Sequence, residues 1–353
     1  MSINQFLDIT VAKYASDLHL MVGVPPSIRV NGELLPIPGT EPLSPTDIEV
    51  LILPLLLPTQ KDILVQNWEL DFGLDFQNKA RFRVNVYKEK GNFAAAFRLI
   101  PKDIRRLDDL GLPPVVHKIT ELKQGLVLVT GPTGHGKSTT LASFINQINQ
   151  VRNGHIITIE DPIEFVYPKG KCLISQREVN SDTRSWSNAL KSVLREDPDV
   201  VLIGEMRDLE TISAAMTIAE TGHLVFATLH TNSAAQTVDR IIDIFPVNQQ
   251  PQIRTQLAAV LEAIISQRLV TTIQPGRTLA AELLFGNPAF KAMVREGKTH
   301  MIDNMIQTSA EAGMTNIETS LATLVRAGKI NFETAQNYAI NPQLLGKILG
   351  YIK

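Results

Sequence analysis

A glycine-rich loop containing a lysine is the part of this sequence best suited to chemistry. Its residues match the pattern G-x-x-x-x-G-K-[ST], and they are Gly131, Pro132, Thr133, Gly134, His135, Gly136, Lys137 and Ser138. In such a loop, consecutive backbone N–H groups curl around an anion, the lysine reaches the β- and γ-phosphates, and the serine hydroxyl binds Mg²⁺. An apolar run at 126–129 precedes the loop, and Thr139 opens a helix-like segment after it. Because the order strand, loop, helix also directs a positive helix end at the loop, residues 131–139 predict a nucleoside triphosphate site.

Acidic residues follow two apolar segments downstream of the loop. The run at 155–159 leads into an acidic cluster at 160–164, and the run at 200–203 leads into Glu205. The alternation of strands and helices after residue 125 predicts a parallel sheet, and ligands of such sheets bind at the carboxyl ends of the strands. An acid in this place is expected to hold Mg²⁺ or its water. Glu205 is therefore a candidate metal-binding residue, together with Ser138.

Two histidines delimit a third apolar segment, with His223 at its start and His230 at its end. They are seven positions apart, which is an odd number, so on a regular strand the two imidazoles point to opposite faces. They are therefore not expected to share a metal ion. A histidine at a strand end is most often an ordinary hydrogen-bonded polar group, but the end that carries His230 faces the predicted phosphate site, which leaves both readings open.

The N-terminal third has a different character. At 80–86, apolar residues alternate with polar ones, so one face of the predicted strand is apolar and the opposite face carries Arg81 and Arg83. Arg98 lies within another strand-like segment at 93–100. Neighbouring arginines on a sheet usually mark a solvated face, and the alternative is contact with a γ-phosphate. Residues 1 to about 105 thus predict a small α+β domain with an antiparallel sheet.

Length and composition set the remaining bounds. A chain of 353 residues is expected to form about two domains, and we place a linker at 106–124, an ATPase-like α/β domain at 125–353, and a helical tail from about 288. The net charge of -2 and the absence of a basic stripe argue against a nucleic-acid partner. The single cysteine, Cys172, excludes an intrachain disulfide and a four-cysteine zinc site, and it fits a reducing cytoplasm. No apolar run approaches the ~18 residues of a membrane span.

Taken together, the motifs resemble those of the secretion-superfamily AAA+/RecA-like ATPases, and within them the PilT-type retraction motors of type IV pili. The resemblance runs over nearly the whole chain. Besides the phosphate loop, its markers are Ser16-Asp17-Leu18-His19, an "Asp box" at 159–164, an atypical Walker B motif at 197–208 and a "His box" at 219–231.

The resemblance implies a fold, a set of roles and a set of partners. It implies a PAS-like N-terminal domain, a RecA-like P-loop ATPase domain, and a homohexameric ring that binds ATP and Mg²⁺ between these domains. Glu164 would be the general base, and Glu205 would position Mg²⁺ through water. His223 and His230 would sense the phosphate, and Arg81, Arg83 and Arg98 would approach it. The motor would lie in the cytoplasm at the inner face of the cytoplasmic membrane, on a pilus platform protein.

The branch within this superfamily is an expectation of its own. Assembly and type II secretion ATPases commonly carry a long extra N-terminal region and a four-cysteine zinc subdomain, and this sequence has neither. Retraction is therefore favoured. Phe290, Lys291 and Ala292 stand where retraction motors have Ile, Arg and Asn, so an accessory retraction motor or an assembly ATPase is the alternative. A nucleotide-binding regulator without hydrolysis is disfavoured, because Lys137 and the acids are intact.

Overall fold

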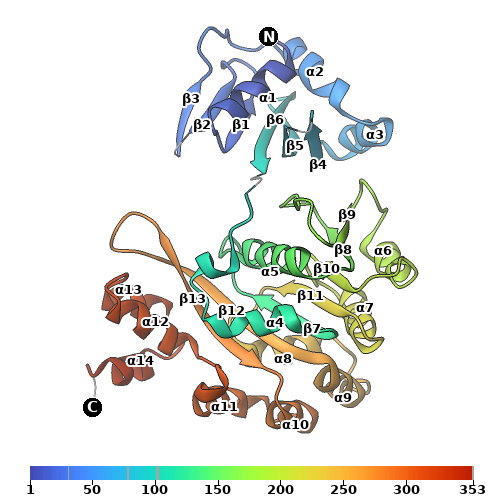
Figure 1. Cartoon of the computed structure of the whole chain (residues 1–353). Helices are drawn as coiled ribbons and strands as arrows, with labels where there is room; N and C mark the ends of the chain where they lie inside the picture. The colour runs from blue at the N-terminus through green and yellow to red at the C-terminus, as the bar shows by residue number, and fades with distance from the viewer. Residues whose placement is uncertain (31, 78, 101–102, 352–353) are drawn as a thin grey trace. The chain divides into compact units, whose positions relative to one another are not determined.

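Two sheets of different kinds organise this chain (Figure 1). The structure, a computed structural model, describes residues 1–30, 32–77, 79–100 and 103–351. These residues divide into two compact units. The first holds residues 1–103 together with two later segments, 161–166 and 178–182, and the second holds the remainder.

The described residues of the first unit form a six-stranded sheet in the order β3-β2-β1-β6-β5-β4, and its paired strands are antiparallel. The strands are β1 (Asp17–Leu20), β2 (Ser27–Val30), β3 (Glu33–Pro36), β4 (Glu69–Phe76), β5 (Ala80–Glu89) and β6 (Asn92–Ile100). The helices are α1 (Ile3–Ala12), α2 (Pro45–Ile52) and α3 (Pro58–Asn67). The predicted antiparallel N-terminal domain is confirmed.

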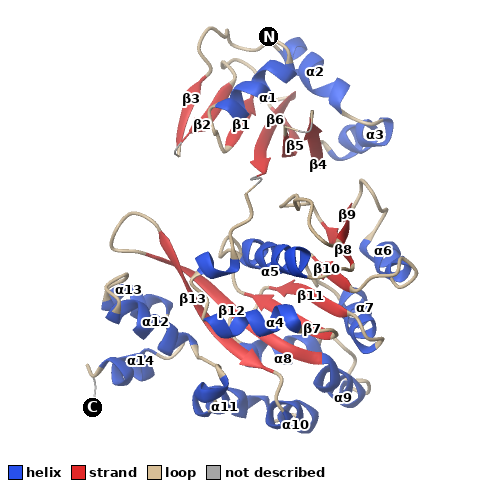
Figure 2. Ribbon diagram, in the orientation of Figure 1, coloured by secondary structure: helices blue, strands red, loops and turns tan. Residues whose placement is uncertain are grey.

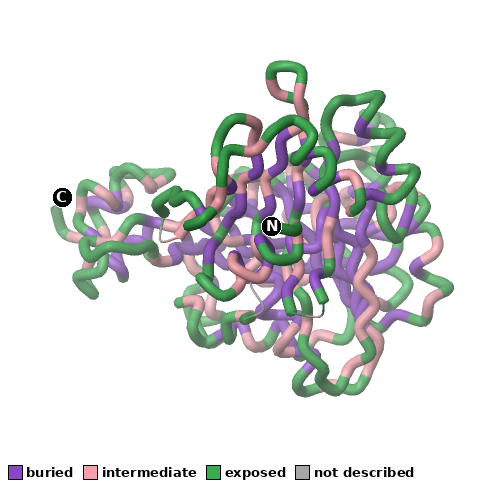
Figure 3. Tube along the Cα trace, turned by 90° about the horizontal axis from the view of Figure 1, so that it is seen from above, coloured by how far each residue is buried: buried purple, intermediate pink, exposed green. Residues whose placement is uncertain are grey.

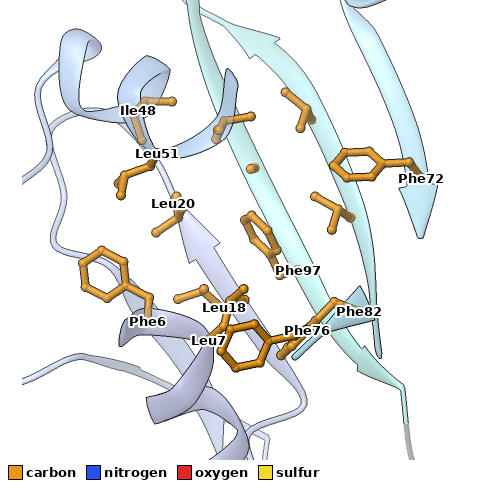
Figure 4. Close-up of a cluster of buried hydrophobic side chains, with 14 of the residues drawn as sticks. Phe6, Leu7, Leu18, Leu20, Ile48, Leu51, Phe72, Phe76, Phe82 and Phe97 are labelled. Carbon is orange, nitrogen blue, oxygen red and sulfur yellow. The ribbon is translucent and has the colours of Figure 1, made fainter. Parts of the chain in front are cut away.

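One face of this sheet is apolar and packs against the helices (Figure 4). Phe82 and Phe97 on the central strands are fully buried, and Phe6, Leu7 and Ile48 reach them from α1 and α2. The alternation along β5 is strict, since its apolar residues are buried while Arg81, Arg83 and Asn85 are not. The opposite face of the sheet therefore remains free to carry charged residues.

The second unit contains a seven-stranded sheet, counted over the described ranges, in the order β13-β12-β7-β11-β10-β8-β9 (Figure 2). Strands β12, β7, β11, β10 and β8 run parallel, and β13 is antiparallel to β12. The bounds are β7 (Gly125–Thr130), β8 (His155–Glu160), β9 (Leu173–Glu178), β10 (Val200–Ile203), β11 (Leu224–Leu229), β12 (Leu261–Thr271) and β13 (Arg277–Phe285). The predicted parallel-sheet, RecA-like domain is confirmed.

Every residue of β7, β10 and β11 is buried, as expected for strands covered on both faces. One face packs against α4 and α5, and α7 and α8 contact the strands as well. In the second unit, the α-helices up to residue 260 are α4 (His117–Glu121), α5 (Lys137–Val151), α6 (Trp186–Val193), α7 (Leu209–Glu220), α8 (Ala234–Asp243) and α9 (Gln250–Val260).

Helices fill the chain after β13. They are α10 (Pro288–Glu296), α11 (Ile302–Thr308), α12 (Ile317–Arg326), α13 (Phe332–Tyr338) and α14 (Pro342–Leu349). Buried and exposed positions alternate along them (Figure 3), and Leu321, Ala335 and Leu345 meet in a small core of their own. Of the helices in the described part of the chain, none combines the length and the apolar character that crossing a membrane requires.

Residues 106–124, which we expected to be a linker, are packed into the second unit. Leu107, Leu112, Val116 and Ile119 join the core formed by β7 and α5. The described second unit accordingly begins at Ile104. Proline and glycine in this stretch therefore bend a packed segment.

Candidate active site

The phosphate loop joins the fully buried strand β7 to helix α5. Gly136 is the N-cap of α5 and has a φ of +83°, which side chains with a Cβ rarely adopt. Gly131 has a φ of +141°, and a Cβ there would clash with the backbone oxygen of Gln267 on β12. Glycine is thus required where the chain leaves the sheet and where the helix begins. The loop presents backbone N–H groups at a helix N-terminus, which is the arrangement that binds phosphate.

Lys137 lies over this loop. Its ammonium donates to the carbonyl oxygens of Gly131 (2.9 Å) and Pro132 (3.0 Å). The same Nζ atom is 3.5 Å from Nδ1 of His230, and the Thr133 hydroxyl is 3.4 Å from that nitrogen. The loop lysine and the His-box histidine, which are 93 residues apart in sequence, therefore meet at one place.

Strand β12 supports the loop from behind. The buried amide of Gln267 donates to the carbonyl oxygen of His135 (2.8 Å), and the Leu269 N–H donates to Nδ1 of His135 (3.0 Å). Burial lowers the pKa of His135, and the charges of Arg268, Lys137 and Arg277 lower it further, so the neutral ring can accept this bond. Our sequence reasoning missed this support, although polar residues in an apolar run at 266–268 are a visible signal.

Glu205 and His230 come together because β10 and β11 are adjacent and parallel, with Ile203 paired to Ala227. One oxygen of Glu205 lies 3.1 Å from Nε2 of His230, and the other accepts a hydrogen bond from Arg207 at 2.8 Å. Burial opposes ionisation of Glu205. The hydrogen bond and charge of Arg207, with the charges of His230 and Lys137, outweigh burial and lower the pKa. Glu205 is therefore ionised at neutral pH.

These residues fit a magnesium ion bound with a nucleotide. Mg²⁺ prefers oxygen ligands and keeps several waters. Ser138 supplies a hydroxyl in the first turn of α5, and Glu205 supplies an ionised, partly exposed carboxylate (22% of its side chain) at the same edge of the sheet. Both predicted metal-binding residues thus offer the right chemistry.

The structure does not bring His223 to this place. His223 precedes β11 and His230 follows it, so the two lie at opposite ends of this strand. At the usual rise per residue of a strand they are roughly 23 Å apart. Nδ1 of His223 is 3.1 Å from both the Ile218 carbonyl oxygen and the Thr221 hydroxyl. Within its own chain, His223 cannot contact a phosphate held by the loop.

Charged side chains line the open face of the first unit's sheet. Arg29, Asp17, Arg98 and Arg83 stand directly opposite one another on β2, β1, β6 and β5. Asp17 is 3.0 Å from Nε of Arg98 and 4.0 Å from Nε of Arg29, and Nε of Arg83 is 3.9 Å from Asp71. The side chains of Arg83 and Arg98 are 43% and 70% exposed. Adjacent like charges are unfavourable by themselves, which suits this pair to an anion.

Arg81 differs from the other two predicted arginines, because its side chain is only 13% exposed. Its guanidinium donates to Glu178 at 2.7 Å and to both oxygens of Asp75 at 2.8 and 2.9 Å. Burial would lower the pKa of Arg81, but the hydrogen bonds and charges of Glu178 and Asp75 raise it overall. The Arg81 guanidinium, which we expected to approach a phosphate, is therefore hydrogen-bonded to two carboxylates instead.

Glu164 lies in the segment 161–166, which clusters with the first unit. Its residue is exposed, while the neighbouring Ile163 is buried. Glu160, which ends β8, belongs to the second unit and accepts a hydrogen bond from Thr158 at 2.6 Å. The acidic cluster is thus divided, and Glu164 is grouped with Arg83 and Arg98.

Comparison with known proteins identifies the family of this chain. The family model described as "Type II/IV secretion system protein" matches residues 66–332. The chain is 44% identical over 343 residues to the type IV pilus retraction ATPase PilT of Pseudomonas aeruginosa, covering 97% of this chain and 99% of that protein. It is 48% identical over 319 residues to a twitching motility protein of Neisseria gonorrhoeae, covering 90% and 85%.

A solved structure of the pilus retraction motor PilT with bound ADP is similar over the same extent. Its TM-score is 0.92 at 42% identity, and the match covers 98% of this chain and 99% of that one. The similarity therefore includes both units as well as the phosphate loop. On these grounds the chain belongs to the type II/IV secretion system protein family.

Proposed function

We propose that this protein is an ATPase that drives retraction of type IV pili. The observation that carries the proposal is the meeting of Lys137, His230 and Glu205 at a glycine loop on a helix N-terminus. A degenerate nucleotide-binding regulator would be expected to have lost at least one of these groups. The near full-length likeness to a pilus retraction ATPase supports the choice of mechanical task.

The reaction is hydrolysis of the bond between the β- and γ-phosphates of ATP. The backbone N–H groups of residues 133–139 bind the phosphates, and Lys137 exchanges the carbonyl oxygens of Gly131 and Pro132 for phosphate oxygens. Glu164 accepts a proton from the water whose oxygen attacks the γ-phosphorus, and the β–γ bridging bond breaks to give ADP and phosphate. A bound Mg²⁺ would neutralise phosphate charge, with Ser138 and Glu205 holding it, in part through water.

Arg83 and Arg98 are the residues of the first unit that we assign to the transferring phosphate. They are exposed, adjacent, and only partly compensated by Asp17 and Asp71. An arginine at this phosphate is worth ~10³–10⁵ in rate. Because these arginines sit on residues 1–105, motion of that domain would couple hydrolysis to mechanical work.

The assembly we propose is a homohexameric ring in the cytoplasm, seated on a pilus platform protein at the inner face of the cytoplasmic membrane. Nucleic acid is not a proposed partner. The support is the likeness to pilus retraction proteins together with a net charge of -2. His223, at the sheet edge opposite the loop, keeps its predicted sensing role only toward a nucleotide held by another copy.

An accessory retraction motor is the second candidate, and one stretch favours it. Phe290 is fully buried, and Lys291 pairs with Glu262 at 2.7 Å, so both residues are built into the packing of α10. These residues replace the Ile and Arg that the resemblance leads one to expect in retraction motors. This departure from the expected motif is the observation that favours an accessory motor.

Two experiments test the proposal. In vitro, Lys137→Ala should abolish ATP binding and turnover, whereas Glu164→Gln should abolish turnover and leave nucleotide binding intact. In cells, a chromosomal Lys137→Ala should give abundant pili without twitching. Bald cells would mean an assembly motor, and unchanged pili would mean an accessory one. Normal turnover by Glu164→Gln would refute the base assignment.

A further inference from the structure

Glu178 is a buried carboxylate to which the reaction proposed above gives no role. It ends β9, and 2% of its side chain is exposed. Within the described ranges it accepts hydrogen bonds from Gly73 N (2.8 Å), an Arg81 guanidinium nitrogen (2.7 Å) and Ile163 N (3.1 Å). These donors come from β4, from β5 and from the segment that carries Glu164. One carboxylate therefore ties the β4–β5 hairpin to the segment that carries Glu164, which is far from the hairpin in sequence.

Glu178 and Arg81 form an ion pair that is largely shielded from solvent. Burying a carboxylate is costly unless a cation and further donors satisfy it, and Arg81 supplies the cation from a side chain that is itself 13% exposed. Asp75 holds the other edge of the same guanidinium, from an exposed position. Charge-assisted bonds of this kind are short and directional, so the pair fixes geometry as well as charge.

Gly73 leaves the space that this arrangement needs. A Cβ at residue 73 would lie 2.5 Å from the Arg81 guanidinium and 2.6 Å from a Glu178 oxygen. The backbone of β4 therefore approaches the pair closely enough to donate its N–H, and any side chain would push the pair away. Gly73, Arg81 and Glu178 are therefore in mutual contact, and this packing requires glycine at position 73.

The third donor connects this group to the proposed base. Ile163 is buried (5% exposed) and directly precedes the exposed Glu164. On the other side, the N–H of Glu178 donates to Asp182 at 2.8 Å, and the Asp182 N–H donates back to the Glu178 carbonyl oxygen at 2.8 Å. The Glu178 carboxylate thus holds the backbone N–H of Ile163, and two hydrogen bonds with Asp182 in turn hold the backbone of Glu178.

We propose that Glu178, with Arg81 and Gly73, is a positioning residue that fastens the segment carrying Glu164 to the N-terminal sheet. The proposal rests on the function argued above, in which Glu164 is the general base. It assigns Arg81 to this anchor in place of a phosphate contact. The anchor then links the proposed base to the unit that carries Arg83 and Arg98.

The primary test is Glu178→Gln in the full chain. An amide offers one oxygen to three donors and turns an N–H toward another donor, so the segment at 163 loses its anchor. Misplacing a catalytic group by about 1 Å costs on the order of 10²-fold in rate. We expect kcat for ATP hydrolysis to fall by that order, with KM and binding of a fluorescent ATP analogue unchanged.

Three further variants separate positioning from general stability. Asp75→Asn removes the exposed partner of Arg81 and leaves Glu178 in place, so its kcat should match that of the wild type. Arg81→Lys keeps a cation and should lose less activity than Arg81→Ala.

Amide hydrogen exchange measures directly how firmly the segment at 161–166 is held. Amides in the peptide at 161–166 should exchange roughly tenfold faster or more in Glu178→Gln, as expected when a bond to a charged group is lost. Exchange in β7 and β11 should not change. If Glu178→Gln does not fold, Gly73→Ala and Arg81→Lys carry the same measurement.

The outcomes separate this inference from the proposed function. Wild-type turnover and exchange in Glu178→Gln, with Glu164→Gln inactive, would overturn the anchor alone. A raised KM at constant kcat in Arg81→Ala would restore Arg81 as a phosphate contact and would also overturn it. Full activity in Glu164→Gln would instead remove the base assignment on which both proposals depend.

Discussion

Glu205 carries a negative charge at the point where the nucleotide's metal is expected. Its pKa is lowered because Arg207, His230 and Lys137 outweigh the effect of burial. Glu205→Gln keeps the shape of the side chain and removes that charge. Residues that orient a metal through water typically contribute 10–100-fold in metal affinity or activity, so we expect a loss in that range, together with a higher Mg²⁺ requirement, in a steady-state ATPase titration.

Glu210→Gln is the matched control for this prediction. Glu210 is an exposed carboxylate on α7 that pairs with Lys191, so its substitution should leave both kcat and the Mg²⁺ requirement unaltered. An unchanged Mg²⁺ titration in Glu205→Gln would contradict the metal assignment.

At the residue scale, sequence reasoning was most successful where a residue's role follows from its neighbours in the chain. Lys137 and Ser138 are fixed by the loop and helix around them, and Glu205 by the strand before it. Arg81 shows the limit. Its decisive partner, Glu178, lies 97 residues away, and an alternating strand pattern does not show which arginine is buried against a carboxylate.

Glu282 joins two elements, strand β13 and helix α8. It is 4% exposed, and its carboxylate accepts the N–H of Ala234, the first residue of α8, at 2.7 Å. Burial, together with the charges of Asp303 and Glu318, raises the pKa of Glu282 to about 7, although the Ala234 bond and the charge of Arg268 oppose the rise. Helix α8 begins three residues after the His box, so this bond holds the start of the helix, and with it the C-terminal end of the box, against β13.

The raised pKa of Glu282 predicts a pH-dependent stability. Between pH 4.5 and 7 the folded protein keeps the proton that the unfolded chain has lost, so stability falls as pH rises through this window. Glu282→Gln removes the titration and keeps an oxygen for Ala234. At pH 8 it should gain up to about 3 kcal/mol over wild type, or roughly 2–4 °C in Tm for each kcal/mol.

Differential scanning calorimetry of the nucleotide-free protein at pH 5 and pH 8 checks this prediction. The gain should be large at pH 8 and much smaller at pH 5, because pH 5 lies only about half a unit above the ordinary pKa of this carboxyl. An equal shift at the two pH values would mean that the substitution acts through packing and not through the proton.

Elements were predictable where one sequence signal sufficed. Ser44, Pro45 and Asp47 start α2 with a capping box and a proline in the first turn. The segment at 106–124 was harder, because its prolines indicate a linker while Leu107 and Ile119 are buried in the second unit. Proline reports local backbone restriction, and it carries no information about what packs against the neighbouring residues.

At the scale of the whole molecule, ring assembly is the central expectation. Six copies of the 39.0 kDa chain have a mass of about 234 kDa. The Glu164→Gln protein with Mg²⁺ and ATP should reach this mass in light scattering after size exclusion, because it binds nucleotide without consuming it. Lys137→Ala should not respond to ATP. A mass that stays at one or two chains with nucleotide at all concentrations would contradict the ring.

The sequence by itself determined the phosphate loop, the kinds of the two sheets, and the acid and histidine at the ends of β10 and β11. These features follow from local chemistry: glycines at positive φ, runs of buried strand residues, and side chains placed where parallel strands end. Only the tertiary structure decided which charges pair. The grouping of Glu164 with the first unit, the Glu178 anchor and the Gln267 support depend on contacts between distant segments. Sequence spacing does not encode these contacts, because they arise when buried polar groups find partners as the chain packs.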